Sequence, residues 1–141
     1  MRLHVMNRSA DPVTGVTLRF IVREADRDFS AVGFEEWLSD MAPCTEVIYE
    51  MDSLRSRGEG ADWEKVSAGR IVGKHILFTD HDGRDWVREE DDLLIGAEAE
   101  KAEDDPFGSE IVREGKVVAL PIVKRAASCG SESGPAGKGP S

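Results

Sequence analysis

Three carboxylates and an imidazole are concentrated in one short segment, Asp80–Asp85, which reads Asp-His-Asp-Gly-Arg-Asp. Carboxylate oxygens gathered on a tight bend are the ligands that a hard cation such as calcium takes. The calcium loop of EF-hands has an acid at its fifth position and glycine at its sixth, where this segment has arginine and aspartate. Aspartate and glycine also favour turns for conformational reasons. We therefore predict a solvated turn and no metal site, with Asp80, Asp82 and Asp85 as the residues that could bind a cation.

The other reactive side chains do not form a catalytic pattern. His4, His75 and His81 lack zinc-ligand spacing, both among themselves and with Cys44 and Cys129. The chain has neither the nucleophile elbow of serine hydrolases nor the phosphate-binding loop that ends in Gly-Lys-Ser/Thr. We predict that the protein is not an enzyme, that it has no catalytic residues and that it uses no cofactor.

Composition narrows the class of partner and the location. The 141 residues, of which 40% are hydrophobic and 33% charged, fit one domain, and the net charge is −10. This charge argues against direct contact with nucleic acid and against a polybasic membrane surface. Apolar runs are too short to span a bilayer, and Arg2 and His4 interrupt the start of any signal peptide. Two cysteines without a metal-type spacing predict reduced thiols, so we expect a cytoplasmic protein.

The acidic residues are concentrated between positions 85 and 105. Two bases oppose them, Arg88 and Lys101. The ten acids are Asp85, Glu89, Glu90, Asp91, Asp92, Glu98, Glu100, Glu103, Asp104 and Asp105. Such a run is typical of a solvated face, or of a surface that docks on a basic groove of another protein. In the second case we expect Glu89, Glu90, Asp91 and Asp92 to contact the partner.

Most of the elements that carry these residues alternate in polarity with the period of β-strands. Alternation predicts strands over 16–22, 46–51 and 70–79, and over two short runs within 110–123 that flank a Glu114-Gly115 turn. Asp82-Gly83 predicts a two-residue hairpin loop with Phe78 opposite Val87 and Asp80 opposite Asp85. A further strand is expected at 92–96, and a short helical turn or a charged loop at 97–105.

One segment, near 31–42, has the spacing of an amphipathic helix. Phe34, Trp37, Leu38 and Met41 stand at positions i, i+3, i+4 and i+7, and Pro43 would end the helix. The fold class is therefore mainly β (α+β): a small antiparallel β-barrel or sheet domain with one inserted helix. We expect this single domain to cover 1–125, followed by a disordered tail rich in glycine, serine and proline at 126–141.

Residues 55–96 resemble part of the small co-chaperonin family, the GroES-like proteins that cap the chaperonin barrel. The segment Val72-Gly73-Lys74-His75-Ile76-Leu77-Phe78 resembles a family strand, and Asp82-Gly83, Trp86 and Leu93-Leu94-Ile95 resemble the turn, strand and apolar run that follow it. Upstream, Thr14-Gly15-Val16-Thr17-Leu18 resembles the loop that docks on the chaperonin. The resemblance implies a ring subunit whose Val16 and Leu18 contact a chaperonin and whose strand edges pair between subunits.

Three functions thus fit the sequence, all of them non-enzymatic binding. The first is the co-chaperonin-like ring subunit, which would be a homo-oligomer. The second is an acidic inhibitor or adaptor, of viral origin for example, that covers a basic protein surface through residues 85–105. The third is a virion or scaffold component that packs against copies of itself and exposes an apolar patch.

Overall fold

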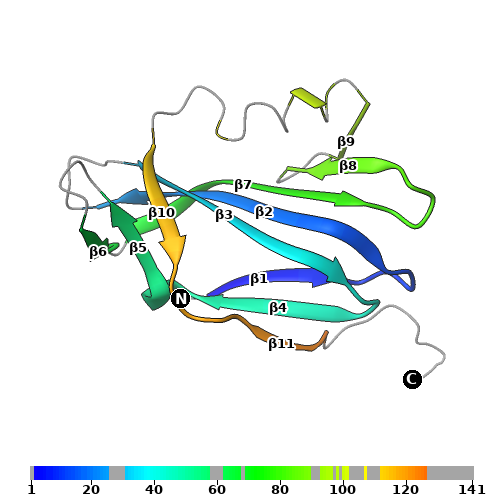
Figure 1. The fold of residues 1–141 in the computed structure, drawn as a ribbon, viewed down its shortest axis with the longest axis horizontal. Helices are drawn as coiled ribbons and strands as arrows, with labels where there is room; N and C mark the ends of the chain where they lie inside the picture. Colours follow the sequence, from blue (N-terminus) through cyan, green and yellow to red (C-terminus); the bar gives the residue numbers. More distant parts are fainter. Residues whose placement is uncertain are drawn as a thin grey trace.

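The chain folds into two stacked β-sheets (Figure 1). The computed structural model describes residues 2–25, 31–57, 62–67, 69–89, 93–96, 98, 100–101, 107 and 112–126. One sheet has three strands in the order β1-β4-β11, and the other has eight in the order β6-β5-β10-β3-β2-β7-β8-β9. The strands are β1 (Arg2–Asn7), β2 (Val13–Glu24), β3 (Ala31–Met41), β4 (Thr45–Glu50), β5 (Leu54–Arg57), β6 (Trp63–Lys65), β7 (Gly69–Thr79), β8 (Asp85–Arg88), β9 (Leu93–Ile95), β10 (Arg113–Val117) and β11 (Ile122–Arg125), with a 3-10 turn at Met51–Ser53.

This architecture confirms that the protein is mainly β and refines the rest of the fold prediction. The two sheets remain open and form no closed barrel in the described part of the chain. The pairing is antiparallel except where β10 runs parallel to β3. The predicted strand at 92–96 is present as β9, and Glu98, Glu100 and Lys101 are helical. Ala126 is described, whereas the rest of the expected tail, 127–141, lies outside the described residues.

The core lies between the two sheets. Strand β1 alternates exposed and buried residues, as a strand with one face on a core must. Its Leu3 and Val5 face Tyr49 and Val47 of β4 across the small sheet. From the large sheet, Phe20 and Phe34 stack with ring centroids 4.7 Å apart. The full core contains Leu3, Val5, Val16, Leu18, Phe20, Val22, Val32, Phe34, Met41, Val47, Tyr49, Leu54 and Val66.

The predicted helix near 31–42 is wrong, because this segment is strand β3. Trp37, which the helix would have buried, is 79% exposed. The pairing of β3 with β2 shifts register beside Ser39, whose φ is +59°. Such a bulge inserts one extra residue and reverses the alternation of faces. Phe34 and Leu38, an even number of residues apart, therefore point inward as strand residues do. Met41 also points inward, but it follows Leu38 by three residues instead of two because of the bulge. The apolar residues of a bulged strand thus have the spacing that the sequence analysis read as a helix.

The predicted turn at Glu114-Gly115 is also wrong, since both residues lie within β10. Gly115 is needed for close packing: a Cβ there would stand 2.5 Å from Cε2 of Phe34. Strand β10 is anchored at its start by Arg113, whose Nη2 donates to Oε1 of the fully buried Glu24 on β2. The backbone N–H and hydroxyl of Ser67 donate to the other oxygen of Glu24, both at 3.1 Å.

The expectation of reduced thiols is contradicted at Cys44, which is disulfide-bonded. The chain has one other cysteine, Cys129, which lies outside the described residues. An intrachain partner can therefore only be Cys129. Disulfides persist mainly in oxidising compartments, so the cysteines no longer support a cytoplasmic location.

Candidate functional site: the acidic end of the large sheet

The β7–β8 hairpin carries the Asp80–Asp85 segment, and its register differs from the prediction by one residue. Phe78 pairs with Trp86, and Thr79 with Asp85. The N–H of Gly83 donates to the carbonyl of Asp80 at 3.0 Å, and the N–H of Asp80 to the carbonyl of Arg84 at 2.9 Å. Gly83 has a φ of +82°. This is a three-residue loop made of a type I turn and a left-handed glycine, where the sequence analysis assumed a two-residue loop.

The side chain of Asp80 holds this loop together. Its Oδ1 accepts the backbone N–H groups of Asp82 and Arg84, each at 2.9 Å, and its Oδ2 accepts the indole N–H of Trp86 at 2.8 Å. The Trp86 hydrogen bond, followed by the backbone bond from Arg84, lowers the pKa of this carboxyl below its ordinary value. Asp80 is thus a structural carboxylate.

The possible cation ligands do not converge. Both oxygens of Asp80 are occupied by donors, and Oδ1 of Asp85 accepts the Thr79 hydroxyl at 2.6 Å. Asp82 faces the ring of His81 at 3.5 Å. Within the described ranges, no three histidine, cysteine, aspartate or glutamate side chains are grouped so that they could hold a metal ion. The acidic turn is explained by its own hydrogen bonds.

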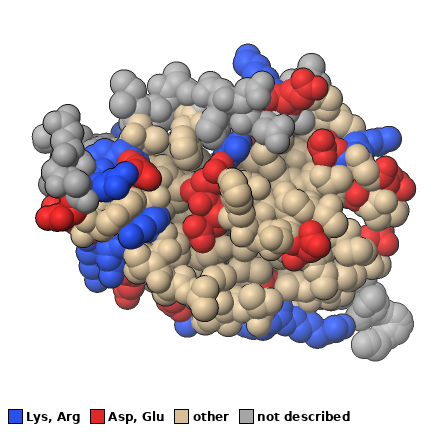
Figure 2. Space-filling view, viewed as in Figure 1, with Lys and Arg blue, Asp and Glu red and all other residues tan. Residues whose placement is uncertain are grey.

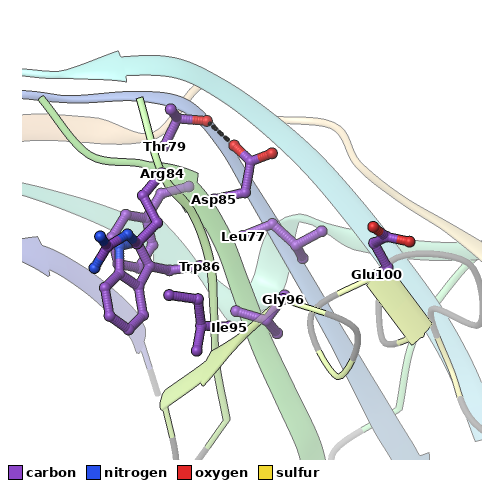
Figure 3. A pocket seen from close by; sticks show the side chains of 10 residues that line it. Leu77, Thr79, Arg84, Asp85, Trp86, Ile95, Gly96 and Glu100 are labelled. Atoms are coloured by element: carbon purple, nitrogen blue, oxygen red, sulfur yellow. Dashed lines mark hydrogen bonds between the residues drawn. The ribbon is translucent and has the colours of Figure 1, made fainter. Parts of the chain in front are cut away.

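A cavity of about 330 Å³ lies beside the hairpin and is bordered by β9 (Figure 3). Its polar lining consists of the carboxylates of Asp85 and Glu100, the hydroxyl of Thr79 and the guanidinium of Arg84. The apolar wall comes from Leu77, Phe78, Trp86, Val87 and Ile95. Glu100 belongs to the acidic run noted in the sequence, whereas the sequence did not single out Thr79, because only the folded hairpin brings the two together. A space with an apolar wall and carboxylates suits a side chain with an aliphatic stem and a cationic head.

Strand β9 forms one edge of the large sheet. Its hydrogen-bonded neighbour is β8, and no other described strand pairs with it. Leu94 packs with Leu77 and Val87, whereas Leu93 and Ile95 are 44% and 41% exposed. An edge strand with free backbone groups and exposed aliphatic side chains is a template for pairing with another strand.

Acidic side chains surround this edge. Glu98 and Glu100 follow β9 and are exposed. The predicted contact residue Glu89 precedes it and pairs with Nε2 of His75 at 2.9 Å. The other three predicted contacts, Glu90, Asp91 and Asp92, lie outside the described residues. Figure 2 shows acidic side chains on the upper right of the molecule, where Figure 1 places β8 and β9.

The other predicted contact residues, Val16 and Leu18, lie in the core. Each is 1% exposed, on the inner face of β2. The apolar side chains of the segment that resembles a docking loop instead bury β2 against the small sheet. In this fold neither side chain is accessible to a partner.

His75 lies in a row of charged side chains. The row crosses β3, β2 and β7 and ends at Glu89, just after β8: Glu35 accepts from Nε of Arg19 at 2.5 Å, Arg19 pairs in register with His75, and His75 pairs with Glu89. A cavity of about 300 Å³ adjoins the row and is lined also by Phe107. Its described lining contains no hydroxyl or thiol side chain. The row therefore pairs opposite charges across the sheet.

Comparison with known proteins gives no relative: no protein-family model matches the chain, and neither curated proteins nor solved structures match it. Among the described residues, no helix combines the length and the apolar character that crossing a membrane requires. The function must therefore be argued from the acidic end itself.

Proposed function

We propose that this protein is a non-enzymatic binding module that docks a basic segment of a protein partner on the acidic end of its large sheet. One observation carries the proposal: β9 has β8 as its one neighbour among the described strands, and it exposes Leu93 and Ile95 beside the exposed acids Glu98 and Glu100. An extended partner would add a strand to this edge, so main-chain hydrogen bonds would give affinity and side chains specificity. The carboxylates would select cationic side chains, and the neighbouring cavity would accept one of them.

This proposal corresponds to the acidic adaptor among the three functions that fit the sequence. The co-chaperonin-like version relied on Val16 and Leu18 as contacts, and their burial removes that support. The adaptor version relied on residues 85–105, and the exposed Glu98 and Glu100 beside β9 support it. A non-enzymatic role is further supported by the engagement of His75 and Asp80 in structural pairs.

A synthetic peptide of alternating lysine and isoleucine tests the proposal, with a glutamate–isoleucine peptide of the same length as the control. We expect the lysine peptide to bind with an affinity that falls as salt rises above about 0.15 M, where the screening length is about 8 Å. Isothermal titration calorimetry measures this affinity. An affinity that does not change with salt concentration, or equal affinities for the two peptides, would contradict the proposal.

Charge-reversed variants locate the binding surface. Glu98→Lys with Glu100→Lys should weaken the lysine peptide about tenfold or more, because an attractive pair becomes a repulsive one. The matched control, Asp40→Lys with Asp52→Lys, changes the net charge by the same amount at exposed positions away from β9. Equal weakening by both double variants would show a general charge effect and refute the location. Reversal of Glu89, Glu90, Asp91 and Asp92 to lysine extends the test to the residues predicted from sequence.

A further inference from the structure

The outer face of β6, β5 and β10 is basic, and it lies at the end of the large sheet that is farthest from β9. Residues of β5 alternate between buried and more exposed positions, so Arg55 and Arg57 point away from the core. Lys65 of β6 and Lys116 of β10 both lie opposite Arg55 in register. Figure 2 shows Lys and Arg side chains gathered on the left of the molecule, where Figure 1 places β5 and β6.

Lys65, Arg55 and Lys116 form a row of three cations across neighbouring strands. Like charges directly opposite one another destabilise a sheet, because they repel. The described carboxylate nearest to the row is that of Asp52, which is 94% exposed and 4.0 Å from Nζ of Lys65. Arg55 donates to the backbone carbonyls of Asp52 and Leu54, and no described carboxylate pairs with it or with Lys116. An anion bound over the row would therefore remove a repulsion.

An aromatic ring stands beside the row. Trp63 of β6 lies opposite Arg57, whose guanidinium carbon is 4.9 Å from the centre of the ring. Nζ of Lys116 is 4.2 Å from the same centre. Glu114 accepts from Nη2 of Arg57 at 2.5 Å, so this arginine is neutralised and helps to hold the ring. Trp63 remains partly exposed, and its ring is therefore accessible next to three cations.

We infer that this face binds single-stranded nucleic acid. The cations would contact successive phosphates, and a base would stack on the exposed part of Trp63. Proteins that bind single strands combine these two features, a positive surface that follows the backbone and aromatic side chains that stack on bases. An acidic polypeptide would use the cations and leave the ring without a partner, so the tryptophan favours nucleic acid.

The net charge of −10 argued against nucleic acid, but that argument treats the charge as evenly spread. The acidic end lies at β9, seven strand spacings from β6 in the large sheet. With strands about 4.8 Å apart, this separation is about 34 Å along the sheet. The screening length at about 0.15 M salt is about 8 Å, so carboxylates at β9 hardly repel a ligand at β6. The local charge therefore decides which ligand this face accepts.

A fluorescein-labelled strand of about ten thymidines tests the inference, with binding followed by fluorescence anisotropy. We expect binding at about 0.05 M salt, and a plot of log affinity against log salt concentration should have a slope of about −2, the value for three phosphate contacts. An abasic strand of the same length keeps the phosphates and lacks the bases, so it should bind about fivefold or more weakly. No binding at about 100 µM protein, or equal affinities for the two strands, would overturn the inference.

Variants of the cation row locate the site. Lys65→Gln with Lys116→Gln removes two phosphate contacts, so the salt slope should shrink to about −0.7 and the affinity should fall about tenfold or more. The matched control, Lys74→Gln with Arg88→Gln, removes two exposed cations from β7 and β8 and should leave the affinity within about twofold of wild type. Equal weakening by both double variants would show a general charge effect and overturn the inference.

Trp63→Leu separates stacking from charge. It should weaken binding of the thymidine strand about fivefold or more, whereas Trp63→Tyr keeps an aromatic ring and should retain most of the affinity. Circular dichroism checks that both variants fold, and the abasic strand tests stacking on the wild type if Trp63→Leu does not. An unchanged affinity in folded Trp63→Leu would overturn the inference.

A polyglutamate peptide of about ten residues tests for the other class of ligand. It carries negative charges without bases, so it should bind more weakly than the thymidine strand, and Trp63→Leu should not change its affinity. Polyglutamate binding as tight as that of the thymidine strand would mean that this face takes an acidic protein segment, and it would overturn the inference.

Discussion

The ion pair between Glu24 and Arg113 allows a quantitative prediction. Glu24 is fully buried, and the side chain of Arg113 is 25% exposed. The pair joins the end of β2 to the start of β10, and Ser67 donates two more hydrogen bonds to the same carboxylate. Removing one partner takes this ion pair away from the other charge, and breaking a buried ion pair costs about 3–5 kcal/mol in proteins.

We therefore expect Arg113→Met and Glu24→Leu each to lower the free energy of unfolding by about 3 kcal/mol or more. The double variant removes both charges together, so its loss should be well below the sum of the two single losses. Because a domain of this size is stable by about 5–15 kcal/mol, the single variants should remain measurable.

Urea unfolding followed by tryptophan fluorescence measures these values. For a slope of about 1.5 kcal/mol per molar urea, a loss of 3 kcal/mol lowers the midpoint by about 2 M. Hydrogen exchange should accelerate first in β10 and its neighbour β5, which the pair holds against the sheet. Single losses that add within about 0.5 kcal/mol in the double variant would refute the coupling between the two side chains.

Two further predictions concern a partly buried carboxylate and the disulfide. Burial raises the pKa of Glu36 above its ordinary value of 4.5, so the free energy of unfolding should fall as the pH rises through the raised pKa. In thermal unfolding, Glu36→Gln should be more stable than wild type at pH 7 and equal to it at acidic pH. A stability difference that does not change across this pH range would contradict the assignment. Because Cys44 is disulfide-bonded, Cys44→Ser should lower the free energy of unfolding by about 2–4 kcal/mol. Wild type in dithiothreitol should lose the same amount in urea unfolding, and equal stability with and without reductant would refute a stabilising crosslink.

Sequence alternation identified most strands because one face of each must contact the core. It predicted β2, β4, β7 and β9, and it found the apolar positions of β2 correctly. The same pattern could not tell a face that packs inside the chain from a face that packs on a partner. The resemblance to a chaperonin-docking loop placed Val16 and Leu18 at an interface, and the small sheet covers them instead.

The acidic charge of the candidate site could be predicted from the sequence, but the arrangement of its side chains could not. The acidic run after position 85 directed attention to the end of the sheet where the proposed site lies. The hairpin register, however, depended on the side chain of Asp80, which bonds Trp86 six residues away and favours the longer loop. Since a change of one residue in register exchanges the two faces of a strand, the lining of the cavity could not follow from the sequence.

By itself, the sequence determined that this protein is mainly β, acidic at one segment, and without a motif for catalysis. These properties depend on composition and on residues that are close together in the sequence, so they can be read from the sequence directly. Only the tertiary structure decided that 31–41 is a bulged strand, that Glu24 meets Arg113, and that β9 is the last strand of the large sheet among the described residues. Each of these depends on which distant strands become neighbours, and that choice is made by the burial of the whole core.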